Sequence, residues 1–200
     1  MSTTYFREYL TLGEEKKLLA TVAATAGLLA ERDHAWILAL RHTGCRIDAF
    51  SRLTVAHAEA VLKTGYLTLP AAIMKRKKGH TLYVSKPGRM AFKSLLSVRR
   101  RMRFAHDPDG PLVMSRNHDP MSVRSYQARL RYWDTKAGLG LGISPHWFRH
   151  TFAKRLMASS EAQNPVLIVM AALGHTDIRS TLQYTWPDKE TMELELENAA

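Results

Sequence analysis

The polar residues with the clearest chemical potential lie in a short segment of the C-terminal half. His-Trp-Phe-Arg-His at 146–150 follows Pro145 at the predicted start of a helix. With 3.6 residues per turn, His146, Arg149 and His150 share one face of that helix. A guanidinium can bind two phosphate oxygens at once, and an imidazole can exchange a proton near neutral pH. The segment therefore holds groups suited to phosphate chemistry, although a polar surface helix would look similar.

A second group of polar residues surrounds a tight turn near the C-terminus. In Leu-Gly-His-Thr-Asp at 173–177, Gly174 ends one predicted helix, and the polar residues after it can cap the next. His175 is therefore expected in an inter-helix turn with a fixed direction. Tyr184 follows nine residues later, near a predicted helix end, where a single aromatic residue most often packs into the core.

Two basic features occur in the N-terminal half. Arg46 follows the helix-ending pair Thr43-Gly44 and can point into a cleft from the start of the next helix. The run Lys-Arg-Lys-Lys-Gly-His at 75–80 occupies a predicted hairpin turn and could lie along a phosphate backbone. Each feature alone has a plainer interpretation, because single arginines and runs of charge are usually solvated.

The order of these features resembles the tyrosine recombinase (phage integrase) family. An Arg, a hairpin Lys, the motif H-x-x-R, a Gly-His turn and a Tyr nine residues later occur in that order, and the resemblance extends from Tyr9 to Thr185. Residues 146–153 and 173–184 carry it most specifically. It implies a site-specific DNA recombinase that cleaves and rejoins strands through a 3′-phosphotyrosyl intermediate, without a metal or other cofactor.

The resemblance also implies roles for individual residues. Arg46 and Arg149 would clamp the non-bridging oxygens of a scissile DNA phosphate and neutralise the charge that grows in the transition state. Tyr184 would be the nucleophile, and its covalent intermediate would store the phosphodiester energy. His146 would help to deprotonate Tyr184, and His175 would hydrogen-bond the phosphate and support the site.

The family's hairpin lysine, which protonates the departing 5′-oxygen, is similar to Lys75. We choose Lys75 because seven residues separate it from Leu82, where the apolar residue of the returning strand is expected; Lys77 stays an alternative. His150 follows the second arginine as in many members, and we expect it to support the site rather than to take part in the chemistry.

The sequence departs from the family pattern at three further places. Ala49 stands where an acidic residue usually follows the first arginine, and Asp48 lies one position earlier. Residues 159–164 are expected to form an inserted surface loop. Few residues precede the first predicted helix, so we expect the N-terminal helical domain, which closes a clamp around the duplex in most members, to be absent.

The elements that must position these residues are mostly helical. A capping box at Thr11 and Glu14 predicts the start of the first helix. Helical patterns follow at 33–42, 46–52, 88–104, 122–137, 145–158, 164–173 and 177–185. Residues 54–85 are expected to be strand-rich, with a strand at 66–70 and a hairpin of 73–75 with 81–84. The predicted fold class is mainly α with a small antiparallel β-sheet of two or three strands (α+β), as in the tyrosine recombinase catalytic domain.

The composition indicates one globular unit with a polyanionic partner. Apolar residues make up 46% of the chain and charged residues 24%, and 29 Lys and Arg against 18 Asp and Glu give a net charge of +11. Such a charge favours nucleic acid first and an acidic membrane or protein second. The single cysteine, Cys45, and the lack of a long apolar segment favour a cytoplasmic protein without disulfides or a zinc site.

We expect two regions, a catalytic domain at 1–187 and an acidic C-terminal tail at 188–200. The resemblance implies that the tail docks on a neighbouring protomer, with Met192, Leu194 and Leu196 as anchors; a frayed, solvated end is the alternative. The implied partners are double-stranded DNA and further copies of the chain, from a dimer to a tetrameric synapse. A DNA-binding accessory protein that lost the chemistry is the alternative function, whereas the short chain argues against a relaxing topoisomerase.

Overall fold

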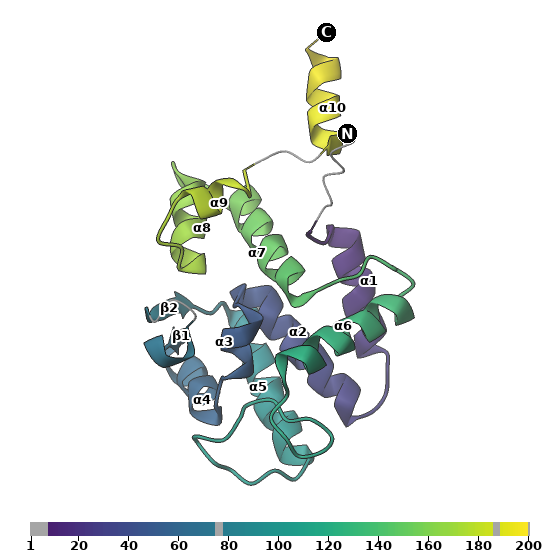
Figure 1. The fold of residues 1–200 in the computed structure, drawn as a ribbon, viewed down its shortest axis with the longest axis vertical. Helices are drawn as coiled ribbons and strands as arrows, with labels where there is room; N and C mark the ends of the chain where they lie inside the picture. The colour runs from purple at the N-terminus through teal and green to yellow at the C-terminus, as the bar shows by residue number, and fades with distance from the viewer. Residues whose placement is uncertain (1–7, 75–77, 186–188, 200) are drawn as a thin grey trace.

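Helix α2, Leu28–Thr43, runs through the centre of the molecule, and helices α1, α5 and α7 pack around it (Figure 1). The computed structural model describes residues 8–74, 78–185 and 189–199. In it, Trp36, Ile37 and Leu40 of α2 are fully buried, as expected for a helix that is apolar on most sides. The helix begins at Leu28, earlier than the predicted start at 33. Its N-cap residue is Gly27, with φ 110°, which has no side chain to cap the helix, so the sequence carries no capping signal at this start.

The helices and strands of the described residues have the following bounds in chain order: α1 Leu12–Ala23, α2 Leu28–Thr43, α3 Ile47–Ser51, α4 Val55–Thr64, β1 Tyr66–Leu69, a 3-10 helix Ala71–Ile73, β2 His80–Tyr83, α5 Lys86–Arg101, α6 Val123–Lys136, α7 Pro145–Ser159, α8 Pro165–Leu173, α9 Arg179–Leu182 and α10 Lys189–Asn198. Within these ranges, no helix combines the length and apolarity needed to cross a bilayer.

The predicted capping box at the start of α1 is confirmed. The Thr11 hydroxyl accepts a hydrogen bond from the Glu14 N–H, and the Glu14 carboxylate accepts one from the Thr11 N–H at 2.8 Å. Both bonds satisfy backbone donors that would otherwise be free at a helix start. The cap sets the direction of α1, which packs on α2 and α6.

The prediction for residues 54–85 was wrong in two respects. Residues 55–64 form helix α4, in which Val55, Ala58 and Val61 are buried at helical spacing. Residues 73–75 were expected to pair with the returning strand, but Ile73 ends a 3-10 helix, and β2 pairs antiparallel with β1.

The observed register explains this pairing. Leu67 of β1 lies opposite Leu82 of β2, so both leucines face the core, while Tyr66 and Tyr83 pair on the exposed face. Pro70, which lacks an N–H, directly follows β1. Among the described residues the sheet has two strands, and β2 begins at His80, the last residue of the basic run that was expected in a hairpin turn.

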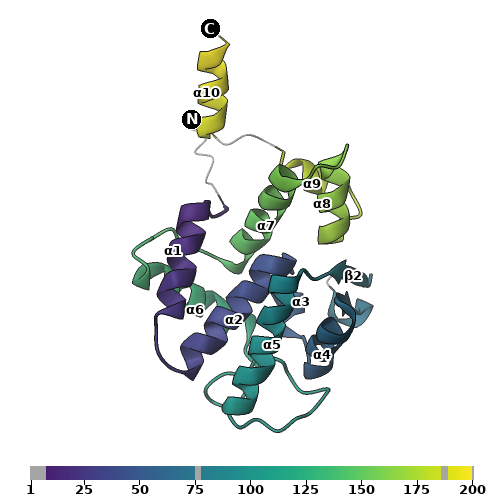
Figure 2. The ribbon, with the colours of Figure 1, turned by 180° about the vertical axis from the view of Figure 1, so that it is seen from behind.

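The C-terminal helices form a second, smaller hydrophobic cluster. Ala153 of α7, Val169 and Leu173 of α8, and Tyr184 after α9 are buried together. Residues 160–164 form the expected connection at the surface, and α9 is shorter than the predicted helix. Figures 1 and 2 show α7, α8 and α9 grouped together, with α10 standing apart from them.

Candidate active site

Arg149, in the second turn of α7, is the central buried cation of the site. Its side chain donates to the carbonyl oxygen of Gly44 at 2.8 Å and to that of Leu173 at 2.9 Å, and it also contacts His175. Burial lowers the pKa of Arg149 to about 10, and the nearby charge of Arg46 acts in the same direction. The side chain therefore stays protonated at neutral pH and joins the ends of α2 and α8 to α7.

The two carbonyl groups that bind Arg149 lie at helix ends that require glycine. Gly44, with φ 57°, ends α2, and Gly174, with φ 63°, ends α8. A Cβ at Gly44 would lie 2.6 Å from the ring of Phe152, and one at Gly174 would lie 2.8 Å from the ring of His80. The negative ends of both helix dipoles thereby face one guanidinium.

His175 occupies the predicted turn and has both ring nitrogens engaged. Its Nε2 lies 2.9 Å from Nη2 of Arg149, and its Nδ1 lies 2.8 Å from the hydroxyl of Thr181. A guanidinium can only donate, so Nε2 accepts and the proton of the neutral ring is on Nδ1. His175 therefore orients Arg149, and Thr181 orients His175.

Tyr184 is buried, with only 6% of its surface exposed, and lies between two histidines. The His150 ring is 5.2 Å away at 77°, and the His175 ring is 6.3 Å away at 13°. Burial raises the pKa of the phenol, while the charge of Arg149 and a hydrogen bond with it act in the opposite direction. The phenol thus reaches the guanidinium of its own chain and is not enclosed elsewhere in the core.

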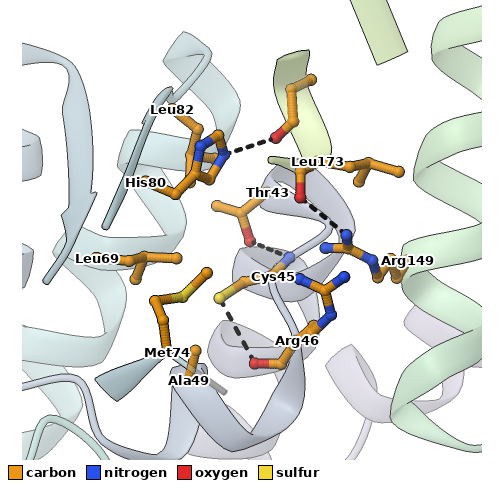
Figure 3. Close-up of a pocket in the computed structure, with 11 residues that line it drawn as sticks. Thr43, Cys45, Arg46, Ala49, Leu69, Met74, His80, Leu82, Arg149 and Leu173 are labelled. Atoms are coloured by element: carbon orange, nitrogen blue, oxygen red, sulfur yellow. Dashed lines mark hydrogen bonds between the residues drawn. The ribbon is translucent and has the colours of Figure 1, made fainter. Parts of the chain in front are cut away.

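Arg46 completes a pair of cations. It is the half-buried N-cap residue of α3, and its side chain has no hydrogen bond or ion pair with any of residues 8–74, 78–185 and 189–199. Arg46 and Arg149 line the same small pocket, where their guanidinium groups lie beside each other (Figure 3). Two like charges in a partly buried pocket favour an anion between them.

His146 and His150 follow each other along α7. His146 is exposed, and its ring centre lies 4.4 Å from that of His150. Burial and the charge of Arg149 lower the pKa of His146. Burial, His146 and Arg149 together lower the pKa of His150 to about 4, so His150 is neutral near pH 7. His150 lies between His146 and Tyr184, which the sequence did not predict.

The predicted general acid, Lys75, lies outside the described residues, as does its alternative Lys77. Met74, which directly precedes Lys75 in the sequence, lines the pocket beside Arg46, and so does Leu69 at the end of β1. Lys78 is described and exposed. The choice between Lys75 and Lys77 therefore stays a prediction.

The departure from the family pattern at 48–49 is visible in the site. Ala49 is buried and lines the pocket. Both carboxylate oxygens of Asp48 accept hydrogen bonds from Nη2 of Arg52, at 2.7 and 2.8 Å. Asp48 is thus engaged with the next turn of the chain and does not hold Arg46.

Two further residues support the site without having been predicted. Thr181 fixes His175, and His80 of β2 lies 3.1 Å from the carbonyl oxygen of Ala172 through its Nε2. His80 therefore connects the sheet to the end of α8. His80 entered the sequence-based prediction only as part of the basic run at 75–80. No local pattern predicted that the His80 ring packs against Gly174.

These residues have the chemistry to bind a tetrahedral anion beside a phenol. Two guanidinium groups can bind the oxygens, and a phenol lies beside one of them. Among the residues described, no cluster of three His, Cys, Asp or Glu side chains could hold a metal ion.

Comparison with known proteins identifies the family of the chain. A sequence profile described as the Phage integrase family matches residues 8–191. The tyrosine recombinase XerC of Pseudomonas fluorescens is 30% identical over 179 residues, which cover 89% of this chain and 56% of the relative. XerC of Alcanivorax borkumensis is 30% identical over 183 residues, covering 90% of this chain and 55% of the relative. The chain thus spans about half the length of these relatives.

Solved structures share the fold. The XerA recombinase superposes with a TM-score of 0.74 at 20% identity, covering 100% of this chain and 65% of that one. The XerH site-specific recombinase bound to its difH substrate superposes with a TM-score of 0.71 at 18% identity, covering 93% of this chain and 52% of that one. From the family profile, the relatives and this fold, the chain belongs to the phage integrase family of tyrosine recombinases and has the fold of their catalytic domain.

Proposed function

We propose that this protein is a site-specific recombinase that cleaves and rejoins double-stranded DNA through a 3′-phosphotyrosyl intermediate. The observation that carries the proposal is the position of the Tyr184 phenol beside Arg149, next to the Arg46 guanidinium, which has no hydrogen bond or ion pair with the described residues. The proposed nucleophile thereby lies beside Arg149, one of the two arginines that line the pocket. The membership of the family and the net charge of +11 support the same substrate.

In the proposed reaction, the scissile phosphodiester binds between Arg46 and Arg149. The Tyr184 oxygen loses its proton and forms a bond to phosphorus, while the bond from phosphorus to the 5′-oxygen breaks. The 5′-oxygen takes a proton, for which Lys75 is the expected donor. The two guanidinium groups stabilise the charge of the pentacovalent transition state, and the phosphotyrosyl bond keeps the energy needed for rejoining.

The two predicted histidines have different roles in this proposal. His175 holds Arg149 in the orientation that binds the phosphate, because its neutral ring accepts from that guanidinium. His146, at the exposed side of the cluster, is the expected general acid–base residue that exchanges the phenolic proton with solvent.

We propose that the C-terminal helix assembles protomers on DNA. Helix α10 exposes three apolar side chains among its acidic residues: Met192, Leu194 and Leu196. A groove of about 430 Å³ along α1 and α2 offers complementary apolar and basic residues, with one acidic residue among them. Its lining comprises Leu12, Glu15, Lys16, Leu19, Ala20, Ala23, His34 and Arg41. The proposed occupant of this groove is α10 of a neighbouring protomer. The active assembly would then be a homo-oligomer on DNA. We expect it to act in the cytoplasm.

The test of the proposed function is a covalent trapping experiment. Duplexes that bind the full chain are selected from a random library, and each is then nicked at successive positions, so that cleavage releases a short 5′-hydroxyl fragment. Wild-type protein is expected to form a covalent DNA adduct that denaturing gels resolve. Tyr184→Phe should bind the same duplexes with equal affinity and form no adduct.

Two results would contradict the proposal. An adduct formed by Tyr184→Phe would assign the nucleophile elsewhere. Tight DNA binding by wild-type protein without an adduct on any nicked duplex would favour a DNA-binding accessory protein.

A further inference from the structure

A buried imidazole nitrogen without a partner lies next to the nucleophile. Nε2 of His150 is buried and has no hydrogen-bond partner in the described part of the chain. Its ring lies between those of His146 and Tyr184, with ring-centre distances of 4.4 and 5.2 Å. Unsatisfied buried polar atoms are rare and destabilising, so one beside a reactive phenol calls for a functional explanation.

The other groups that contact Tyr184 are poorly suited to accept its proton. Arg149 only donates hydrogen bonds. Both nitrogens of His175 are engaged, with Arg149 and with Thr181. His146 has a ring contact with His150, whereas the ring contacts of Tyr184 are with His150 and His175. In the tautomer that carries its proton on Nδ1, His150 is the neighbour that can offer a free lone pair to the phenol.

Building on the proposed recombinase function, we propose that His150 is a catalytic residue that accepts the phenolic proton of Tyr184 during DNA cleavage. The O–H bond of Tyr184 breaks and its proton moves to Nε2 of His150, as the phenolic oxygen bonds to phosphorus. The bond from phosphorus to the 5′-oxygen breaks, and that oxygen takes a proton from the general acid expected at Lys75. Rejoining reverses each transfer, and His146 is the next group toward solvent.

The electrostatics of the site prepare His150 for this step. The charged and titratable groups that face it are His146 and Arg149 on α7 and Tyr184 after α9, with Arg46 on the far side of Arg149. Burial, and after it the charges of His146 and Arg149, keeps the free imidazole neutral. A phosphodiester bound between the two arginines brings a negative charge, which offsets them and makes His150 more basic when the proton must move.

Substrate binding would also redirect the phenol. In the structure, the Tyr184 phenol lies beside the Arg149 guanidinium and makes no hydrogen bond to Nε2 of His150. A phosphate oxygen that takes over the Arg149 donor would leave the phenol free to turn toward the adjacent ring of His150, whose Nε2 has no partner among the described residues. The phosphate would thus bring the nucleophile and its base together.

The test measures single-turnover adduct formation on the nicked duplex, with variants of His150. His150→Ala and His150→Phe should both slow adduct formation by about 100-fold or more, with DNA affinity unchanged. Added imidazole should restore the rate of His150→Ala but not that of His150→Phe, whose ring fills the space. His150→Gln, a polar variant that cannot be protonated, should lose the acid limb of the pH profile.

The outcomes separate this inference from the proposed function. Wild-type adduct formation, absent in Tyr184→Phe, tests the recombinase chemistry independently of His150. Near-wild-type rates for His150→Phe would reduce His150 to a packing residue and overturn the inference. Imidazole rescue of His146→Ala but not of His150→Ala would transfer the role to His146. Thermal unfolding of each variant excludes misfolding, and His150→Gln provides the pH readout if His150→Ala does not fold.

Discussion

At the scale of single residues, the two arginines differ in how the protein holds them. Arg149 is buried and bonded to two backbone carbonyl groups and to His175, whereas Arg46 has no such bonds in the described part of the chain. Arg149 should therefore contribute to stability in addition to its proposed role in phosphate binding, whereas Arg46 should have only the proposed role. This difference can be measured.

Arg149→Lys and its matched control Arg46→Lys should both lower adduct formation by about 100-fold or more, because an ammonium cannot reproduce bidentate phosphate binding. Only Arg149→Lys should also lower the free energy of unfolding, by about 3 kcal/mol, since a single amine cannot satisfy both carbonyl groups. Urea denaturation compares the two variants. Equal stability of both would show that the bonds of Arg149 do not support the fold.

A residue away from the site predicts acid sensitivity. Burial, Arg41 and Arg155 lower the pKa of His42 to about 4, from the ordinary value of 6.5. Between these two pH values the unfolded chain binds a proton that the folded chain excludes, so stability falls as the pH drops from about 6.5 to 4. Allowing for partial solvation, His42 should account for about 1–2 kcal/mol of this loss.

His42→Gln should therefore reduce the difference in unfolding free energy between pH 7 and pH 5. This range covers most of the upper part of the interval between the ordinary pKa of 6.5 and the folded-state pKa of about 4. The exposed His118, substituted by Asn to suit its φ of 65°, is the control and should leave the difference unchanged. An undiminished pH dependence in His42→Gln would assign the acid sensitivity to other groups. Urea titrations at both pH values provide the measurement.

At the scale of elements, the site depends on how helix ends meet. The turn after α8 presents Leu173 O and His175 to Arg149, and it packs against His80 of β2. Gly174 combines a left-handed backbone with this close contact. Gly140 allows the effects of backbone strain and of packing on stability to be separated. It has the same φ of 63° as Gly174, but a Cβ added at Gly140 would meet no atom within 4 Å.

Gly140→Ala should lower the free energy of unfolding by about 1 kcal/mol, through backbone strain alone. Gly174→Ala should lower it by about 2–4 kcal/mol, because the new methyl also displaces His80. It should also slow adduct formation, whereas Gly140→Ala should not. Equal effects of the two substitutions on stability would mean that the contact with His80 adds nothing.

At the scale of the whole molecule, assembly should depend on α10 and the groove along α1 and α2. Leu12 lines the groove and is 76% exposed, so a charge there should leave the fold intact while opposing an apolar ligand. Leu12→Asp should lower the number of protomers per DNA duplex in light scattering and keep the affinity of a single protomer. Leu62→Asp, at an exposed leucine of α4 outside the groove, is the control.

A loss of assembly in Leu194→Asp would support α10 as the occupant, since Leu194 is exposed on that helix. Unchanged stoichiometry in both Leu12→Asp and Leu194→Asp would contradict the proposed docking. The affinity of the single protomer should fall steeply with salt in every variant, because binding to the backbone releases counterions.

The sequence by itself determined the features that depend on neighbours along the chain. The capping box at Thr11, the glycines that end α2 and α8, and the shared helix face of His146, Arg149 and His150 follow from local spacing. The order of the polar segments was sufficient to recognise the family. At 54–85 the prediction missed α4, although Val55, Ala58 and Val61 have helical spacing, and it paired β2 with residues 73–75 because local spacing does not decide strand partners.

Only the tertiary structure decided which of these groups meet. Arg149 joins Gly44, 105 positions earlier, to Leu173, 24 positions later, and no local pattern indicates such partners. The structure also placed His150, rather than His146, against Tyr184, and Nε2 of His150 has no hydrogen-bond partner among the described residues. Such distances depend on how α7, α8 and α9 pack, because a helix sets the direction of its side chains but not the neighbour that they face.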